Sequence, residues 1–145
     1  MPLEPERCCL SDCPYARECR IEKMHMRENP VRDKSFSFAL RVVKLAKFLE
    51  GTKREYVLSK QVLRSGTAVG ALVRESEHAE SKADFIHKMS IALKEANETL
   101  YWLDLLYQGD YIDEQSFDSV RSDSAELIKL LISIVKTSKA ARHSD

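Results

Sequence analysis

The chain has 145 residues, of which 43% are hydrophobic and 32% are charged, and its 23 basic side chains balance 23 acidic ones. This length suffices for one hydrophobic core, so we expect one globular domain, and no stretch approaches the roughly 20 consecutive apolar residues of a membrane-spanning helix. Charges stand where a signal peptide would have its apolar segment, which predicts a cytoplasmic protein.

The first part of the chain contains all four cysteines, and prolines occur only up to residue 30. We expect an N-terminal extension over residues 1–30, which can be flexible, ahead of a helical bundle over residues 31–145. Cysteine thiolates bind tetrahedral zinc and iron–sulfur clusters, so the extension is a candidate metal site, although no Cys-x-x-Cys pair is present. The alternatives are a tail with free thiols or an upstream segment with the functional start at Met24 or Met26. The candidate ligands are Cys8, Cys9, Cys13 and Cys19.

Apolar residues at helical spacing predict two helices in the first half of the bundle. The first should cover residues 34–50 and end at Gly51, and the second should cover residues 55–79. Gly66 and Gly70 lie inside the second helix, where the lack of a side chain would let a neighbouring backbone approach closely. The stretch between them lacks the Gly-Lys-Ser/Thr ending of a phosphate-binding loop, so we do not expect nucleotide binding.

Two further helices should follow, over residues 81–108 and 113–138. Ser81 and Asp84 resemble a capping box at the start of the third helix, with Asp in place of the usual Glu or Gln. Short connections between long helices favour antiparallel neighbours, so the sequence predicts an all-α protein with an antiparallel up-down four-helix bundle. The predicted core positions of the third helix are Phe85, Met89, Ala92, Leu93, Ala96, Leu100, Leu103 and Tyr107.

Charge is distributed unevenly although its total is zero. Residues 28–76 hold ten Lys or Arg against five Asp or Glu, whereas residues 77–112 hold three against seven. The first two helices therefore present basic outer faces, which can bind phosphates but can also be ordinary solvated surfaces, and overall neutrality argues against strong, indiscriminate nucleic-acid binding. The candidate nucleic-acid-binding residues are Lys34, Arg41, Lys44, Lys47, Lys60, Arg64 and Arg74.

Three apolar residues of the third helix, Ile91, Trp102 and Leu105, lie away from its core-facing side. They share that side with acidic residues, and an apolar cluster that includes the only tryptophan suggests a partner surface. Because each of the four helices already supplies one apolar stripe to the core, this remainder predicts an interface between copies of the chain.

Three segments carry a resemblance to a known family: DKSFSFALR at residues 33–41, QVLRSGTAVGA at residues 61–71 and DFIHKMSIALKEANETLYWL at residues 84–103. They resemble the bacterial four-helix-bundle proteins named after intervening sequences in large-subunit ribosomal RNA genes, over roughly residues 31–137. The resemblance implies assembly into five-fold rings. The similar accessory variability proteins of diversity-generating retroelements bind a reverse transcriptase and nucleic acid through basic surfaces, which implies such partners here, although this chain is neutral overall.

No nucleophile, base and orienting group can be assembled from the sequence, so no enzyme is expected. Glu75 and His78 have the Glu-x-x-His spacing of di-metal bundles, but no second copy exists, which favours a solvated helix face. The sequence predicts a non-enzymatic, ring-forming scaffold or adaptor, a homo-oligomer and by resemblance a pentamer, whose further partner is nucleic acid or a nucleic-acid-processing protein. The alternative is a metal- or redox-responsive regulator that uses the N-terminal cysteines to bind zinc or an iron–sulfur cluster.

Overall fold

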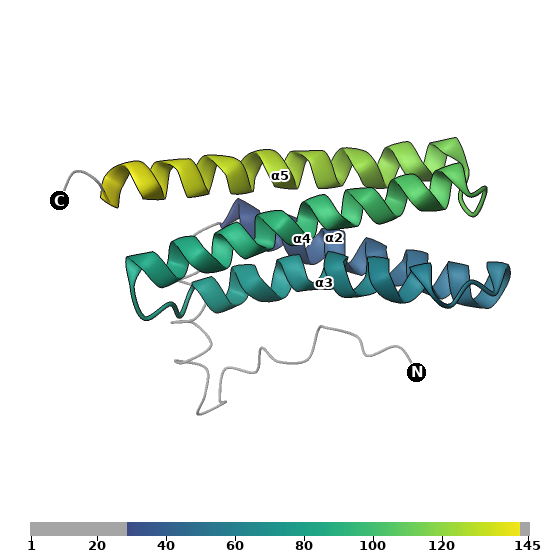
Figure 1. Cartoon of the computed structure of the whole chain (residues 1–145), viewed down its shortest axis with the longest axis horizontal. Helices are drawn as coiled ribbons and strands as arrows, with labels where there is room; N and C mark the ends of the chain where they lie inside the picture. Colours follow the sequence, from purple (N-terminus) through teal and green to yellow (C-terminus); the bar gives the residue numbers. More distant parts are fainter. Residues whose placement is uncertain (1–28, 143–145) are drawn as a thin grey trace, which may run out of the picture.

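The computed structural model describes residues 29–142, which form four long helices with no strand among them. The helices pack side by side in alternating directions, and both ends of this part of the chain lie at the same end of the bundle (Figure 1). The predicted all-α four-helix bundle is confirmed. The helices are α2 (Pro30–Phe48), α3 (Leu58–Ser76), α4 (Lys82–Gln108) and α5 (Glu114–Arg142), and a short π-helical segment, η1 (Leu49–Lys53), continues α2.

The start of α2 corrects the predicted boundary. Pro30 is the first helical residue, and the side chain of Asn29 caps the helix by accepting the backbone N–H of Arg32 at 3.4 Å. A proline fits the first turn because its missing N–H would have no partner in the helix there. The helix therefore begins four residues before the predicted start at residue 34, and Pro30 belongs to the bundle rather than to the extension.

Gly51 does not end the first helix as predicted. The chain passes through Gly51 within η1 and reverses direction at Arg54, whose φ of 52° is left-handed. The Glu55 carboxylate then caps α3 by accepting three backbone N–H groups, those of residues 57–59, at 2.7–3.0 Å. The start of α4 was predicted correctly, since Ser81 Oγ accepts the N–H of Asp84 at 3.1 Å.

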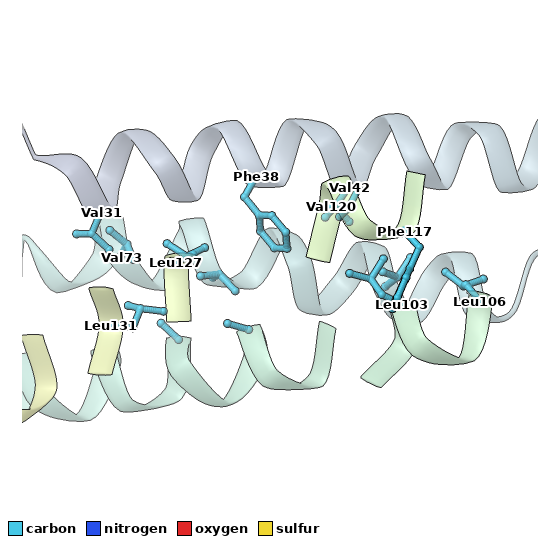
Figure 2. Packing of buried hydrophobic residues seen from close by; sticks show 14 of the residues in the cluster. Val31, Phe38, Val42, Val73, Leu103, Leu106, Phe117, Val120, Leu127 and Leu131 are labelled. Carbon is cyan, nitrogen blue, oxygen red and sulfur yellow. The ribbon is translucent and has the colours of Figure 1, made fainter. Parts of the chain in front are cut away.

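One apolar core runs along the bundle axis. Phe38 and Val42 of α2, Leu103 of α4, and Leu127 and Leu131 of α5 are buried and point between the helices (Figure 2). None of the described helices combines the length and apolar character that crossing a membrane requires.

The buried side of α4 differs in part from the predicted one. Its buried residues include Thr99, whose hydroxyl donates to Ser65 Oγ of α3 at 2.9 Å. A cross-helix hydrogen bond lets a polar residue occupy a core position, and a search for apolar spacing cannot find such a position. Met89, Ala92, Ala96 and Leu103 are buried as predicted; Phe85, Leu93, Leu100 and Tyr107 are only half-buried, and Ile86 and Leu106 are buried instead.

Close packing of α2 on α3 confirms the predicted use of two glycines. A Cβ atom at Gly66 would lie 2.7 Å from a methyl group of Val42, and one at Gly70 would lie 3.4 Å from the carbonyl oxygen of Ser35. These contacts also fix the antiparallel register, because Gly66 is level with Val42 and Gly70 with Ser35. In contrast, α2 and α5 meet less closely than the other neighbouring pairs of helices.

Candidate interaction surfaces

Two of the predicted phosphate-binding cations bridge α2 to α5. Lys34 pairs with Glu126, and Arg41 pairs with Asp123. The Arg41 guanidinium also donates to the hydroxyl of Ser119 at 2.7 Å and to its carbonyl oxygen at 3.2 Å. All four charged side chains remain more than a third exposed, so the pairs stabilise the fold little, but they neutralise the two cations in place.

A third cation, Arg64 of α3, lies across the neighbouring helix α4. Its guanidinium binds Glu98 and, at 3.4 Å, Glu95. The hydrogen bond to Glu98 raises the pKa of Arg64. The pKa of Glu98 is lowered, first by the hydrogen bond from Trp102 Nε1 at 3.1 Å and then by Arg64, against the opposing effect of burial. Arg64 is therefore held between two helices.

A fourth cation, Arg74, lies 5.2 Å from the centre of the Phe36 ring on α2, a cation–π distance. The remaining three predicted cations are Lys44, Lys47 and Lys60, which are exposed and form no ion pair within residues 29–142. The structure thus divides the predicted set of seven into four engaged and three unengaged side chains.

The unengaged cations gather where α2 passes into α3. The register set by Gly66 and Gly70 places Lys47 level with Lys60, and Lys44 lies about one turn earlier in α2, farther from the connection. Arg54 in the connection is also exposed and without an ion pair among the described residues, and sequence reasoning missed it because it lies outside every predicted helix. We call Lys44, Lys47, Arg54 and Lys60 the basic end; the α2–α3 connection closes one end of the bundle (Figure 1).

An exposed apolar surface lies near the C-terminal end of α4. Leu105 is 37% exposed and Tyr101 is 56% exposed, and the Tyr101 ring meets Trp102 edge to face at 5.0 Å. Trp102 itself is half-buried and packs against the core. Ile91 is also half-buried but lies 11 residues before Trp102, about 16 Å along the helix. Of the three residues predicted to form this surface, Leu105 and Trp102 lie together, whereas Ile91 lies apart from them. Tyr101, which was not predicted, lies beside Trp102. We call Tyr101, Trp102 and Leu105 the α4 surface.

A second exposed apolar surface lies on α2, and sequence reasoning missed it. Phe36 is 50% exposed and Leu40 is 46% exposed, and the two lie one helical turn apart with half-buried Val43 in the next turn. Their spacing of three and four residues was a usable signal, but the core stripe of the same helix obscured it. We call Phe36, Leu40 and Val43 the α2 surface.

A groove of about 880 Å³ lies between α2 and α5, beside the α4–α5 turn. Lys44 and Phe48 of α2 stand on one side of it and Tyr111 and Ile112 on the other. Among residues 29–142, no group of three or more His, Cys, Asp or Glu side chains could hold a metal ion, and Glu75 and His78 line only a small surface hollow. The candidate ligands Cys8, Cys9, Cys13 and Cys19 lie outside the described residues.

Comparison with known proteins identifies a family and similar solved structures. The family model of the 23S rRNA-intervening sequence protein matches residues 27–133. One similar structure is the crystal structure of a protein of unknown function from the S23 ribosomal protein family, from Bacteroides thetaiotaomicron. The two sequences are 57% identical, and the match covers 73% of this chain and 98% of that one with a TM-score of 0.73. No curated protein matches. With more than half of its length matched, the chain belongs to the 23S rRNA-intervening sequence protein family.

Proposed function

We propose that the protein is a non-enzymatic, self-associating scaffold in which the α4 surface of one copy packs on the α2 surface of the next. The observation that carries the proposal is that one chain exposes two apolar surfaces on different helices. Clustered apolar residues on a protein surface mark interaction sites, whereas single ones are ordinary. A contact between unlike surfaces is head-to-tail and produces a closed ring when its rotation closes. A ring of five is the assembly that the family resemblance implies.

The charges beside the two surfaces support this pairing. Lys44 and Lys47 lie near the α2 surface, while the exposed Asp104 lies beside the α4 surface. Opposite charges around an apolar centre favour the correct partner and orientation, and like charges disfavour packing of the α4 surface on a second α4 surface.

Mixing two single variants tests the proposal. Leu105→Glu disrupts only the α4 surface and Leu40→Glu disrupts only the α2 surface, so each variant alone should be monomeric by light scattering at micromolar concentration. When the two are mixed, the intact α2 surface of one can bind the intact α4 surface of the other, and a heterodimer should form. Both residues are exposed, so the circular dichroism of each variant should match that of the unmodified protein.

Val57→Glu provides a matched control, because Val57 is 70% exposed and lies on neither surface. This variant should keep the mass of the unmodified protein. A monomeric unmodified protein would contradict the proposed self-association. Variants that stay monomeric on mixing would contradict the head-to-tail pairing.

A second candidate function is nucleic-acid binding through α2 and α3. It is supported by Lys44, Lys47 and Lys60, which are free to contact phosphates, whereas Lys34 and Arg41 would first have to leave their partners on α5. Binding of this kind weakens steeply with rising salt, because each phosphate contact releases counterions. The metal- or redox-responsive alternative depends on cysteines outside the described residues, and metal analysis of the reduced protein tests it.

A further inference from the structure

We propose that the α2–α3 end of the bundle binds single-stranded nucleic acid, with Tyr56 as the platform for a base and with the basic end contacting phosphates. The inference rests on the second candidate function and specifies the kind of strand and the site. It places binding at the α2–α3 connection rather than along the outer faces of the two helices.

Both acidic residues of the connection accept hydrogen bonds from α3; Glu55 is buried and Glu50 is half-buried. The Glu55 carboxylate accepts three backbone N–H groups of α3, and Glu50 Oε1 accepts the hydroxyl of Ser59 at 3.4 Å. Arg54 and Lys60 are exposed on either side of Glu55 in the sequence and have no acidic partner among the described residues. The connection therefore presents positive charge to solvent although it contains acids.

An aromatic ring lies among these cations. Tyr56 is 54% exposed and lies in the connection, two residues after Arg54 and four residues before Lys60. Phe48, 42% exposed at the end of α2, adds a second ring at the rim of the α2–α5 groove. Binders of single strands combine a basic track along the backbone with aromatic side chains on which bases stack. A duplex keeps its bases stacked inside, so exposed rings favour a single strand.

The backbone conformation of Arg54 supports a phosphate-binding role for its side chain. Its φ of 52° is a left-handed conformation that glycine adopts without strain and that a side chain with a Cβ atom disfavours. The guanidinium makes no hydrogen bond or ion pair within residues 29–142, so the fold itself gives no reason for an arginine here. A phosphate contact provides that reason.

Fluorescence anisotropy with labelled 20-nucleotide oligo-dT, oligo-rU and a duplex of the same length tests the inference. Both single strands should bind at least about tenfold more tightly than the duplex, and a difference between them would tell DNA from RNA preference. Tyr56→Ala should weaken single-strand binding between about fivefold and 150-fold, the range measured for loss of one stacked base. Tyr56→Phe keeps the ring and should bind like the unmodified protein.

Arg54→Gly separates binding from folding. Glycine fits the left-handed position, so this variant should be at least as stable in urea as the unmodified protein and yet bind the single strands more weakly. Lys47→Glu with Lys60→Glu should also weaken binding, whereas Lys129→Glu with Lys136→Glu, which changes two exposed cations of α5, should not. The mass of the Tyr56 and Arg54 variants should equal that of the unmodified protein, because neither residue lies on the α2 surface or the α4 surface.

Three results would overturn the inference. Tyr56→Ala could bind as tightly as Tyr56→Phe, which would exclude stacking. The duplex could bind as tightly as the single strands, with a dependence on Lys47 and Lys60, which would leave the second candidate function intact. If none of the three probes bound, the inference and that candidate function would both be wrong, while self-association would remain unaffected.

Discussion

Gly66 sets the distance between α2 and α3. A Cβ atom there would lie 2.7 and 2.8 Å from the two methyl groups of Val42, which is fully buried and cannot move aside freely. Overpacking a core costs about 1–3 kcal/mol, and the higher helix propensity of alanine offsets up to about 1 kcal/mol of this. We therefore expect Gly66→Ala to lower the free energy of unfolding by roughly 1–2 kcal/mol, measured by urea denaturation.

Gly70→Ala is the matched control. Its Cβ atom would lie 3.4 Å from the carbonyl oxygen of Ser35, so the space is narrow but not occupied. This variant should be neutral or slightly more stable, because alanine is the better helix former. Adding Val42→Ala to the Gly66→Ala variant should restore part of its lost free energy of unfolding, because the second substitution removes the clashing methyl groups. A Gly66→Ala protein as stable as Gly70→Ala would refute the close approach.

The start of α3 shows how one side chain can initiate a helix. Burial of Glu55 opposes ionisation, but its hydrogen bonds with three backbone N–H groups outweigh this effect and lower its pKa below the ordinary value of 4.5. A carboxylate with a lowered pKa stabilises the fold fully above its unfolded pKa, and the contribution is lost as the pH falls through the folded pKa. The cap should therefore weaken only in acid.

Glu55→Ala should lower the free energy of unfolding by about 1 kcal/mol at pH 7, as for other lost caps. The difference from the unmodified protein should shrink as the pH falls below 4.5, which urea denaturation at pH 7, 4.5 and 3 can measure. Glu114→Ala, at an exposed position of α5, should change stability little at any of them. A Glu55→Ala deficit that is equally large at pH 3 and pH 7 would show that the loss does not come from the charged cap.

Periodicity was sufficient to predict the four helices and their order, but not all of their ends. Proline and glycine usually mark helix ends, and at Pro30 and Gly51 this rule gave wrong boundaries, because the first lies in an initial turn and the second in a π-helical segment. The true reversal uses a left-handed arginine, Arg54, which no residue preference would predict. By contrast, Ser81 is a favourable cap with a standard hydrogen bond, and it was predicted correctly.

The candidate surfaces were harder to predict than the helices. Sequence spacing shows that a cation lies on an outer face but not whether an acid of a neighbouring helix reaches it, as Asp123 reaches Arg41 and Glu98 reaches Arg64. Such partners lie 31 to 92 residues apart along the chain. Only the packing of the bundle separates the engaged cations from the unengaged ones.

At the scale of the whole molecule, the helices are not held together equally. Three of the neighbouring pairs, α2 with α3, α3 with α4 and α4 with α5, pack closely. The fourth, α2 with α5, meets less closely and is bridged at the surface by Lys34–Glu126 and Arg41–Asp123. The 880 Å³ groove lies between these two helices and is also lined by the α4–α5 turn.

This weaker contact makes the α2–α5 interface the place where the bundle should open first. Local opening in a folded protein begins where few buried apolar contacts must break, so α5 should detach from α2 before any other pair separates. Amide hydrogens in the first half of α5 should then exchange with solvent faster than those in the middle of α4, as measured by mass spectrometry. Equal exchange rates in the two helices would mean that α5 does not detach from α2 before the whole domain unfolds.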